Sequence, residues 1–228
     1  MPTLTFTCVT ASGSETRAIE IRNLIIAGWT GRDPHKVQEH IEELAALGVA
    51  PPATTPCFYL GGAELLTTSP DIDCLGGDSS GEAEFVIVVD ADGERWVGLA
   101  SDHTDREVEA YSIPVSKQMC PKPVAPTLWK MADVAAHWDK LELHSFVDDG
   151  AGFVPYQAGS VDAMLNPLDT IAAWEKLGNS LPPGSAMLGG TLPVKGGIRP
   201  RREFRLELRD PVLNRTITHS YTARWLGV

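Results

Sequence analysis

The sequence has little that would tie the chain to an oxidising compartment or a membrane. Its cysteines are scattered, with no CxxC pair, at Cys8, Cys57, Cys74 and Cys120. This spacing is typical of buried apolar residues or free thiols in a reducing compartment. No apolar run approaches the roughly 18 residues that a membrane-spanning helix needs. We therefore expect a cytoplasmic protein with no membrane partner.

Positive charge is also scarce. The chain has 19 Lys and Arg against 30 Asp and Glu, a formal net charge of −11. Nucleic-acid phosphates demand a basic face, so we expect no nucleic acid as a partner. An anionic small substrate would need a local positive site that works against the global field. Neither a GxGxxG nor a GxxxxGKS/T motif is present to indicate a nucleotide.

The length and composition of the chain are typical of one globular domain. The 228 residues are 43% hydrophobic, too apolar for disorder and long enough for a large core. The first ten residues alternate polar and apolar side chains and have no basic segment, which favours a strand over a secretion signal. We predict a single domain over residues 1–228, of class α+β or mainly β.

Periodicity and turn residues predict the elements. Residues 3–10 and 18–25 are expected to form a first hairpin of strands. A second hairpin is expected over 82–89 and 95–100, around Asp92 and Gly93, and strands over 204–209 and 216–225. A short aromatic strand is expected at 58–60. Helices are expected over 35–47, 126–141 and 167–177.

Three acids at the second hairpin form a candidate metal site. Glu82 and Glu84 are two residues apart in a strand, so their side chains leave the same face. A strict two-residue turn would put Asp102 on the opposite face, whereas a bulge or a three-residue loop would bring it onto theirs. Three converging carboxylates suit Mg²⁺ or Mn²⁺. The alternative is a solvated strand end.

Basic and histidine side chains suggest further parts of a site. Arg106 and Lys117 follow the acids and could meet an anionic ligand, or could simply be surface charges. His40 and Glu43 are three apart on one helix face, where a carboxylate can orient a histidine. Taken alone, the two residues are better explained as a solvent-facing pair, and His35 with Glu39 is a competing pair. The basic cluster at Arg199, Arg201 and Arg202 reads as a solvated loop or as an aid to an anionic substrate.

Six segments in order resemble the fumarylacetoacetate hydrolase (FAH) superfamily. Each is weak alone, but together they cover residues 25–200. They are His-x-x-Glu (His40, Glu43), a proline-led aromatic strand (56–60), Glu-x-Glu (Glu82, Glu84), Asp-x-Thr-x-Arg (Asp102, Arg106), Ser-Lys (116–117) and Gly-Thr-x-Pro (190–193). The chain is similar to an uncharacterised, DUF2848-like branch of that superfamily.

The resemblance implies an FAH-like mixed β-roll with a few peripheral helices, assembled as a homodimer. Within it, residues 1–25 would form N-terminal strands, 26–200 the catalytic core and 201–228 C-terminal strands. The roles that it implies are metal ligands at Glu82, Glu84 and Asp102, catalytic residues at His40, Glu43 and Lys117, and substrate contacts at Arg106, Gly190 and Thr191.

These assignments lead to a functional hypothesis. A divalent ion, Mg²⁺ or Mn²⁺, would chelate a small anionic 2-oxo acid, and His40 with Glu43 would activate water to cleave a carbon–carbon bond in an acylpyruvate-like compound. Without that dyad the same site would support a decarboxylase, hydratase or isomerase. From a different class, the chain could be a catalytically degenerate binder of a small dicarboxylate.

Overall fold

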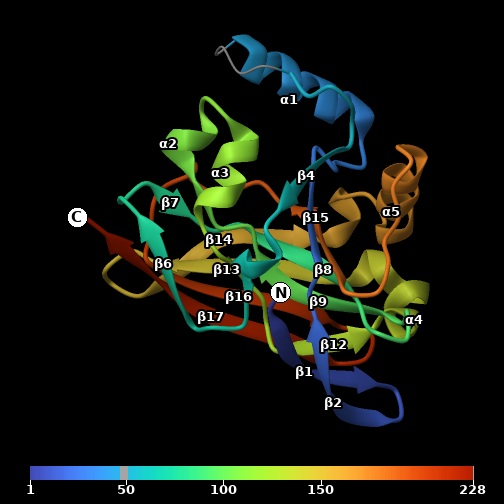
Figure 1. The fold of residues 1–228 in the computed structure, drawn as a ribbon. Coiled ribbons are helices and arrows are strands. Elements are labelled where there is room, and N and C mark those ends of the chain that lie inside the picture. Colours follow the sequence, from blue (N-terminus) through green and yellow to red (C-terminus); the bar gives the residue numbers. More distant parts are fainter. Residues whose placement is uncertain (47–50, 228) are drawn as a thin grey trace.

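The computed structural model of the chain describes residues 1–46 and 51–227. Within helix α1 (Pro34–Ala46), the side chains of His40, Glu43, Leu44 and Ala46 are also outside the described set. Strands outnumber helices, and the helices lie at the periphery of the molecule (Figure 1). The predicted α+β, mainly β class is confirmed.

The larger sheet has eight strands in the order β2-β1-β12-β9-β8-β15-β3-β4. The β1–β12 and β15–β3 pairs are parallel and the other pairs antiparallel. Its strands are β1 (Thr3–Thr10), β2 (Gly13–Glu20), β3 (Asn23–Gly28), β4 (Cys57–Gly61), β8 (Ala83–Val89), β9 (Arg95–Ser101), β12 (Thr127–Lys130) and β15 (Ser185–Thr191).

A second sheet of five strands, in the order β14-β13-β16-β17-β6, packs on the first. Its strands are β6 (Asp71–Leu75), β13 (Glu142–Asp148), β14 (Phe153–Ser160), β16 (Glu203–Asp210) and β17 (Arg215–Leu226). Short strands pair as β10–β7 and β11–β5, with bounds β5 (Leu66–Thr67), β7 (Ser79–Ser80), β10 (Thr104–Asp105) and β11 (Lys122–Pro123).

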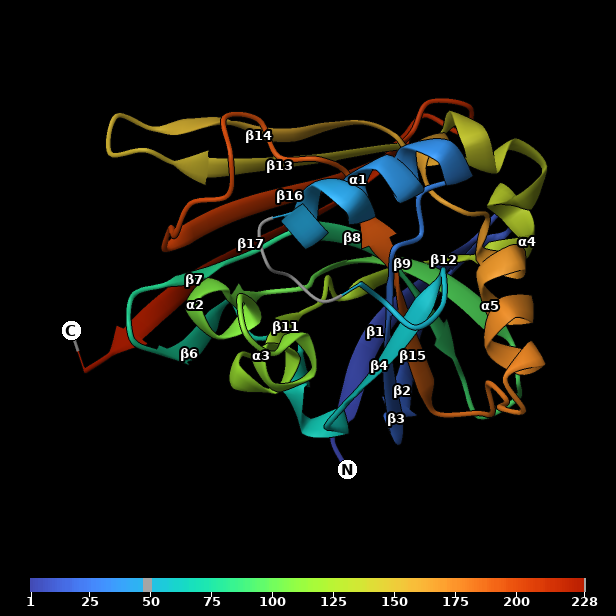
Figure 2. The same ribbon diagram turned by 90° about the horizontal axis from the view of Figure 1, so that it is seen from above.

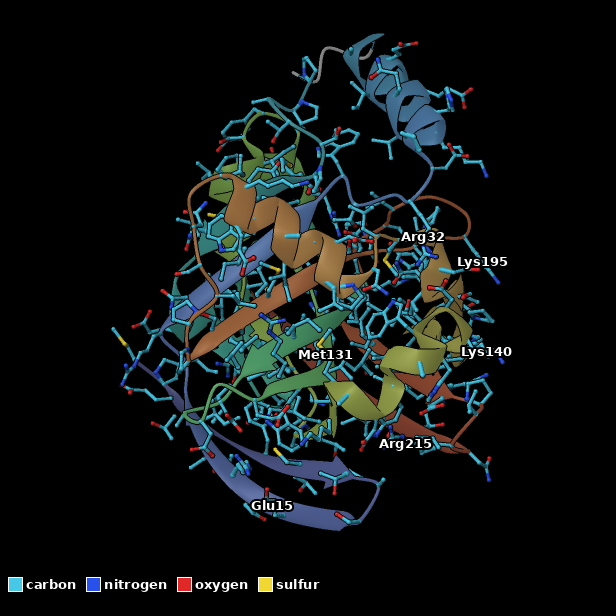
Figure 3. All side chains as sticks on the ribbon, turned by 90° about the vertical axis from the view of Figure 1, so that its right-hand side faces the viewer. Glu15, Arg32, Met131, Lys140, Lys195 and Arg215 are labelled. Carbon is cyan, nitrogen blue, oxygen red and sulfur yellow. The ribbon has the colours of Figure 1, made fainter. Side chains whose placement is uncertain are left out.

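Short helices flank the sheets. Figures 1 and 2 show α2 and α3 together on one side and α4 and α5 on the other. Helix α1 projects at one end, and the β1–β2 hairpin, which carries Glu15, lies at the opposite end (Figure 3). The helices are α2 (Arg106–Glu109), α3 (Ile113–Met119), α4 (Met131–Val134) and α5 (Pro167–Lys176), with 3₁₀ turns η1 (Ala63–Leu65), η2 (Ala135–Lys140) and η3 (Val161–Ala163).

Strand β8 is buried on both faces, which explains its unbroken apolar run. Phe85 and Ile87 point into the core between the two sheets. Val86 and Val88 point the other way, into a second core built from several strands of the large sheet. The large sheet therefore has an apolar core on each of its two faces. β8 therefore fixes the centre of the fold.

Two predicted elements are wrong. Residues 18–25 do not form one strand, since β2 ends at Glu20, the chain turns at 21–22, and β3 starts at Asn23. Residues 126–141 do not form one helix, because Thr127–Lys130 is strand β12, which lies between β1 and β9. Only the later part of that segment is helical, as α4 and η2. Pairing with the distant strands β1 and β9 overrode local helix preference at Thr127–Lys130.

Candidate active site

The register of the β8–β9 hairpin places the three acids on one face. Ala83 pairs with Ser101, and the Asp102 N–H donates to the Glu82 carbonyl at 2.9 Å. Position 102 is therefore directly opposite position 82, and directly opposed residues share a face. The Asp90 N–H donates to the Glu94 carbonyl, so the connecting loop has three residues. The three-residue-loop alternative is the one that the structure adopts.

Glu84 is an acid enclosed by the core. Its side chain is buried, and one carboxylate oxygen accepts a 2.7 Å hydrogen bond from the Gly190 N–H. Burial, together with the nearby negative charge of Asp102, raises the pKa of Glu84 well above its usual range, and the Gly190 bond offsets only part of this. A nearby cation would stabilise the ionised form of such a buried carboxyl group.

Asp102 is buried but fully paired. The Lys117 ammonium lies 2.7 Å from one carboxylate oxygen and the Lys122 ammonium 3.0 Å from the other. The Thr104 hydroxyl adds a third contact at 3.2 Å. Burial alone would raise the pKa of Asp102, but the two lysines outweigh it and hold that pKa well below the usual range. Asp102 is therefore a fixed negative charge.

Arg106 and Lys117 meet at one further acid, Glu109. Arg106 contacts Glu82 at 3.3 Å and Glu109 at 2.7 Å, and its Nε donates to the Ser80 hydroxyl at 2.8 Å. Lys117 contacts Glu109 at 3.1 Å. Both cations are almost wholly enclosed, so the interpretation of Arg106 and Lys117 as surface charges is wrong. They supply the local positive charge that the acidic composition lacks.

Gly190 and Thr191 lie beside the acids because β15 pairs with β8. A Cβ at Gly190, where φ is +99°, would lie 1.8 Å from the Thr30 hydroxyl, so only glycine fits there. The Thr191 hydroxyl donates to the Ala83 carbonyl at 2.6 Å and accepts from the Gln157 amide at 2.7 Å. The predicted Gly-Thr segment therefore lies against the acid-bearing strand.

The His40 and Glu43 side chains lie outside the described residues, so the dyad stays a prediction. Both positions are in helix α1. The segment before that helix is anchored by Arg32, whose guanidinium forms two bonds to Asp139, at 2.7 and 2.8 Å (Arg32 is labelled in Figure 3). The competing residues His35 and Glu39 are exposed.

The three acids do not yet surround one point. Among residues 1–46 and 51–227, the group of His, Cys, Asp or Glu whose ligand atoms all lie within 4.8 Å of one another is Cys74, His103 and Cys120. Glu82, Glu84 and Asp102 instead contact Arg106, Gly190 and the two lysines. Among the described residues, the carboxylate oxygens of the three acids therefore do not all lie within that distance of one another.

Three residues of the site were not predicted from the sequence. Glu109 could have been found, because it is one helical turn after Arg106. Lys122 and Gln157 carry no local signal. Lys122 is wholly buried against Asp102, and Gln157 joins Ala83 to Thr191 from the second sheet. Only the packing of distant strands brings them to the site.

The arginine cluster beyond the Gly-Thr segment packs on aromatic rings. Arg199 lies over the Tyr156 ring and Arg202 over the Trp225 ring, with 4.8 and 4.6 Å from guanidinium carbon to ring centre. These contacts explain both side chains without any substrate.

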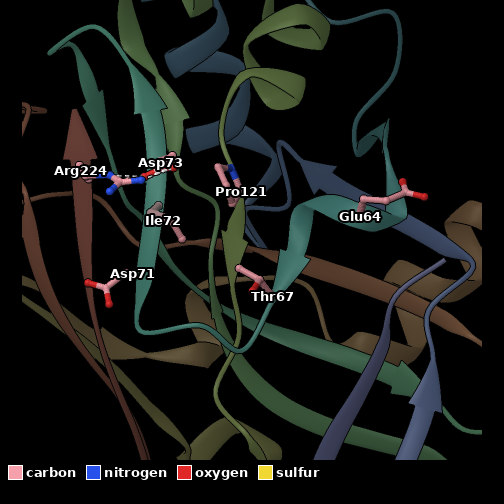
Figure 4. Close-up of a pocket in the computed structure, with 7 residues that line it drawn as sticks. All are labelled: Glu64, Thr67, Asp71, Ile72, Asp73, Pro121 and Arg224. Carbon is pink, nitrogen blue, oxygen red and sulfur yellow. Dashed lines mark hydrogen bonds and ion pairs between the residues drawn. The ribbon is translucent and has the colours of Figure 1, made fainter. Parts of the chain in front are cut away.

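A surface depression lies at a different place from the candidate site. It has a volume of about 540 Å³ and is lined by Glu64, Thr67, Asp71, Ile72, Asp73, Pro121 and Arg224 (Figure 4). Its polar lining is dominated by acids, and Arg224 is already paired with Asp73 at 2.7 Å. None of the predicted site residues lines it.

The fold defines the class of protein. The chain is similar to a protein from Oleispira antarctica that carries a provisional assignment as a fumarylacetoacetate isomerase/hydrolase. The two share 19% identity with a TM-score of 0.65, over 98% of this chain and 100% of that one. A yeast protein of the fumarylacetoacetate hydrolase family matches with 18% identity and a TM-score of 0.61, over 90% and 93%. The predicted FAH-like fold is confirmed.

A third similar structure is a 2-keto-3-deoxy-D-arabinonate dehydratase complexed with magnesium and 2,5-dioxopentanoate. It shares 16% identity with a TM-score of 0.63, over 92% of this chain and 77% of that one. The model of the family described as "Protein of unknown function (DUF2848)" matches residues 27–221, and the chain belongs to that family. No curated protein matches the chain. No helix among the described residues is long and apolar enough to cross a membrane.

Proposed function

We propose that the chain is a divalent-metal-dependent enzyme that hydrolyses a carbon–carbon bond in an acylpyruvate-like 2-oxo acid. The observation that carries this proposal is the placement of buried Glu84 and Asp102 beside buried Lys117 at the ends of two paired strands. Perturbed acids next to an enclosed cation are typical of catalytic sites. The shared fold, with a magnesium-bound 2-oxo acid dehydratase among the similar structures, supports it.

Glu82, Glu84 and Asp102 fit a hard divalent cation in their chemistry. All three offer carboxylate oxygens, the ligands that Mg²⁺ and Mn²⁺ prefer. Glu84 in particular is a buried acid without a cation in direct contact among the described side chains. When bound, Mg²⁺ or Mn²⁺ would act as a Lewis acid on the keto and carboxylate oxygens of the substrate.

The remaining residues would bind and orient the substrate. Lys117 and Arg106 would offset the acids and attract the substrate carboxylate. The Gly190–Thr191 segment lies beside Glu84, where the Thr191 hydroxyl could exchange its bond to the Ala83 carbonyl for one to the substrate.

Helix α1 would supply the base. Glu43 would orient His40, whose ring would take a proton from water as the hydroxyl adds to the distal carbonyl carbon. The bond from that carbon to the adjacent methylene then breaks, and its electron pair passes to the methylene carbon, which is reprotonated. The products are pyruvate and the carboxylic acid of the acyl group, which then releases its proton to solvent as the carboxylate forms.

A lyase reaction is the second candidate. The structural similarity to a 2-keto-3-deoxy-D-arabinonate dehydratase favours it. The same acids and cations would serve a decarboxylase, hydratase or isomerase acting on a 2-oxo acid, with no need for the dyad on α1. We also propose a homodimer, which sedimentation analysis can test directly.

Metal removal tests the proposal. The protein is treated with a chelator and dialysed, and pyruvate release is measured with a panel of acylpyruvates and with oxaloacetate. We expect turnover to vanish and to return on adding Mg²⁺ or Mn²⁺. Glu84→Ala should lower the bound metal content. Activity that remains after chelation would contradict the metal-dependent proposal. Binding of every compound without turnover would favour the alternative of a catalytically degenerate dicarboxylate-binding protein.

Histidine variants separate hydrolase from lyase. We expect His40→Ala to lower hydrolysis by about 10² to 10⁴-fold, the usual contribution of a general base, and to lower decarboxylation far less. His35→Ala is the matched variant, because His35 is on the same helix and exposed. Equal losses of both reactions in His40→Ala, or a loss of hydrolysis confined to His35→Ala, would contradict water activation by His40.

A further inference from the structure

A second cluster of possible ligands lies in the core, apart from the carboxylates. It consists of Cys74 on β6, His103 between β9 and β10, and Cys120 directly after α3. One ligand atom from each lies within 4.8 Å of the other two, and the side chains are 0 to 1% exposed. Residues from three distant segments thus bring two sulfurs and an imidazole to one buried point.

The surroundings hold the histidine ring in place. One ring nitrogen lies 3.0 Å from the Tyr221 hydroxyl and the other 2.9 Å from the Ser79 hydroxyl. The Tyr221 hydroxyl is itself 2.8 Å from the Ser101 hydroxyl. When one ring nitrogen of a histidine binds a metal, the other usually keeps such a hydrogen bond, which sets the tautomer and orientation. The cluster has this second contact already.

We propose that Cys74, His103 and Cys120 bind a zinc ion. Two thiolates and an imidazole are the three protein ligands of one known class of Zn²⁺ site, in which water takes the fourth position, and soft sulfur ligands disfavour Mg²⁺ and Mn²⁺. Zinc lies about 2.3 Å from sulfur and about 2.0 Å from nitrogen, so its ligand atoms sit roughly 3 to 4 Å apart. Small rotations of side chains already within 4.8 Å reach that spacing.

Charge favours the same ion. Two thiolates and a neutral imidazole carry two negative charges, which Zn²⁺ cancels, so the filled site is neutral in the core. The Lys122 ammonium donates to the His103 carbonyl, next to the cluster, and offsets part of the rise in the Cys120 pKa that the hydrogen bond with Cys74 and burial cause.

The site would join segments that matter to the carboxylate cluster. His103 directly follows Asp102, and Cys120 ends the helix that carries Lys117. Cys74 lies on β6, at the edge of the smaller sheet. A zinc ion there would fix α3 and the end of β9 to that sheet, and so would hold the Asp102–Lys117 pair in place. The ligands of this ion would be separate from the three acids.

Cobalt spectroscopy tests the assignment. Co²⁺ is added to the full-length, reduced, metal-stripped protein, and thiolate-to-cobalt charge transfer is measured in the near ultraviolet. Carboxylate ligands give no such band, so the readout is specific to the sulfurs. We expect one equivalent of Co²⁺ to produce the band in wild type, and Zn²⁺ to displace it and raise the Tm. Cys74→Ala and Cys120→Ala should lose both effects.

Cys8→Ala is the matched control, because Cys8 is equally buried but belongs to the core on the other face of the large sheet. It should keep the band and the Tm rise. Should the ligand variants fail to fold, zinc X-ray absorption on wild type gives the answer, with sulfur scattering expected at about 2.3 Å. Wild type without the band and without zinc–sulfur scattering, or an unchanged band in both ligand variants, would overturn the proposal.

Discussion

Glu84 and Asp102 show how one site gives two neighbouring acids opposite properties. Both are buried, which by itself favours the neutral form of a carboxyl. Two lysines contact Asp102 and keep it ionised, whereas Glu84 accepts the Gly190 N–H and lies near the negative charge of Asp102, which the more distant Lys117 offsets only in part. The ionised form of Glu84 is therefore expensive, and a bound cation would relieve that cost.

The raised pKa of Glu84 has a measurable effect on stability. In the unfolded chain Glu84 ionises near pH 4.3, but in the folded protein it stays protonated to higher pH. The free energy of unfolding of wild type should fall as pH rises between these two pKa values. We expect metal-free Glu84→Gln to be more stable than metal-free wild type at pH 8, because the amide stays neutral where the buried carboxyl would have to ionise.

Denaturant unfolding in the presence of a chelator measures this difference. It should shrink toward zero at about pH 4, where both side chains are neutral. A variant less stable than wild type at pH 8, or a stability difference that does not depend on pH, would show that ionisation of Glu84 does not destabilise the folded protein.

Lys122 tests the pairing of Asp102. Lys122→Met removes one of its two cations and leaves a buried charge less compensated, which typically costs about 3 to 5 kcal/mol. Lys130→Met is the matched change, because Lys130 forms a partly exposed ion pair with Glu94. It should cost less than about 1 kcal/mol. Similar losses in the two variants, measured by denaturant unfolding, would mean that Lys122 acts only through packing.

At the scale of elements, three adjacent strands build the site. β9 carries Ser101 just before Asp102, β8 carries Glu84, and β15 carries Gly190 and Thr191. The close approach of β15 and β8 depends on a second glycine. A Cβ at Gly189 would lie 2.0 Å from the Phe85 ring, which packs in the core.

Gly189→Ala should therefore destabilise the fold, by about 1 to 3 kcal/mol, the usual cost of overpacking. Gly77→Ala is the control, because a Cβ there would make an ordinary 3.6 Å contact with Trp225. Thermal or denaturant unfolding distinguishes the two. Wild-type stability in Gly189→Ala would mean that Phe85 can move aside freely.

The elements also show how far the sequence could lead. The β8–β9 hairpin could be predicted because a buried β-branched run, an Asp-Gly turn and a second apolar run are local signals. The face on which Asp102 lies then depended only on whether the loop has two or three residues. The strand at Thr127–Lys130 could not be predicted, because its pairing with β1 and β9 is non-local. The Cys74, His103 and Cys120 cluster was missed for the same reason.

At the scale of the whole molecule, the net charge of −11 opposes an anionic substrate. Salt screens charges over about 10 Å at 0.1 M, so it weakens this long-range repulsion more than contacts inside the site. We expect kcat/KM for a 2-oxo acid to rise with moderate neutral salt, measured by steady-state kinetics. An uncharged ester of the same substrate should show no rise. A fall with salt would mean that Lys117 and Arg106 dominate the approach.

The double burial of β8 has one more consequence. A strand packed on both faces and paired on both edges is among the last parts of a protein to open, so its backbone amides should exchange with solvent most slowly. Glu84 is the second residue of that strand. The backbone that carries Glu84 is therefore already ordered in the folded protein. A ligand that binds Glu84 does not have to order this backbone, so binding loses less conformational entropy.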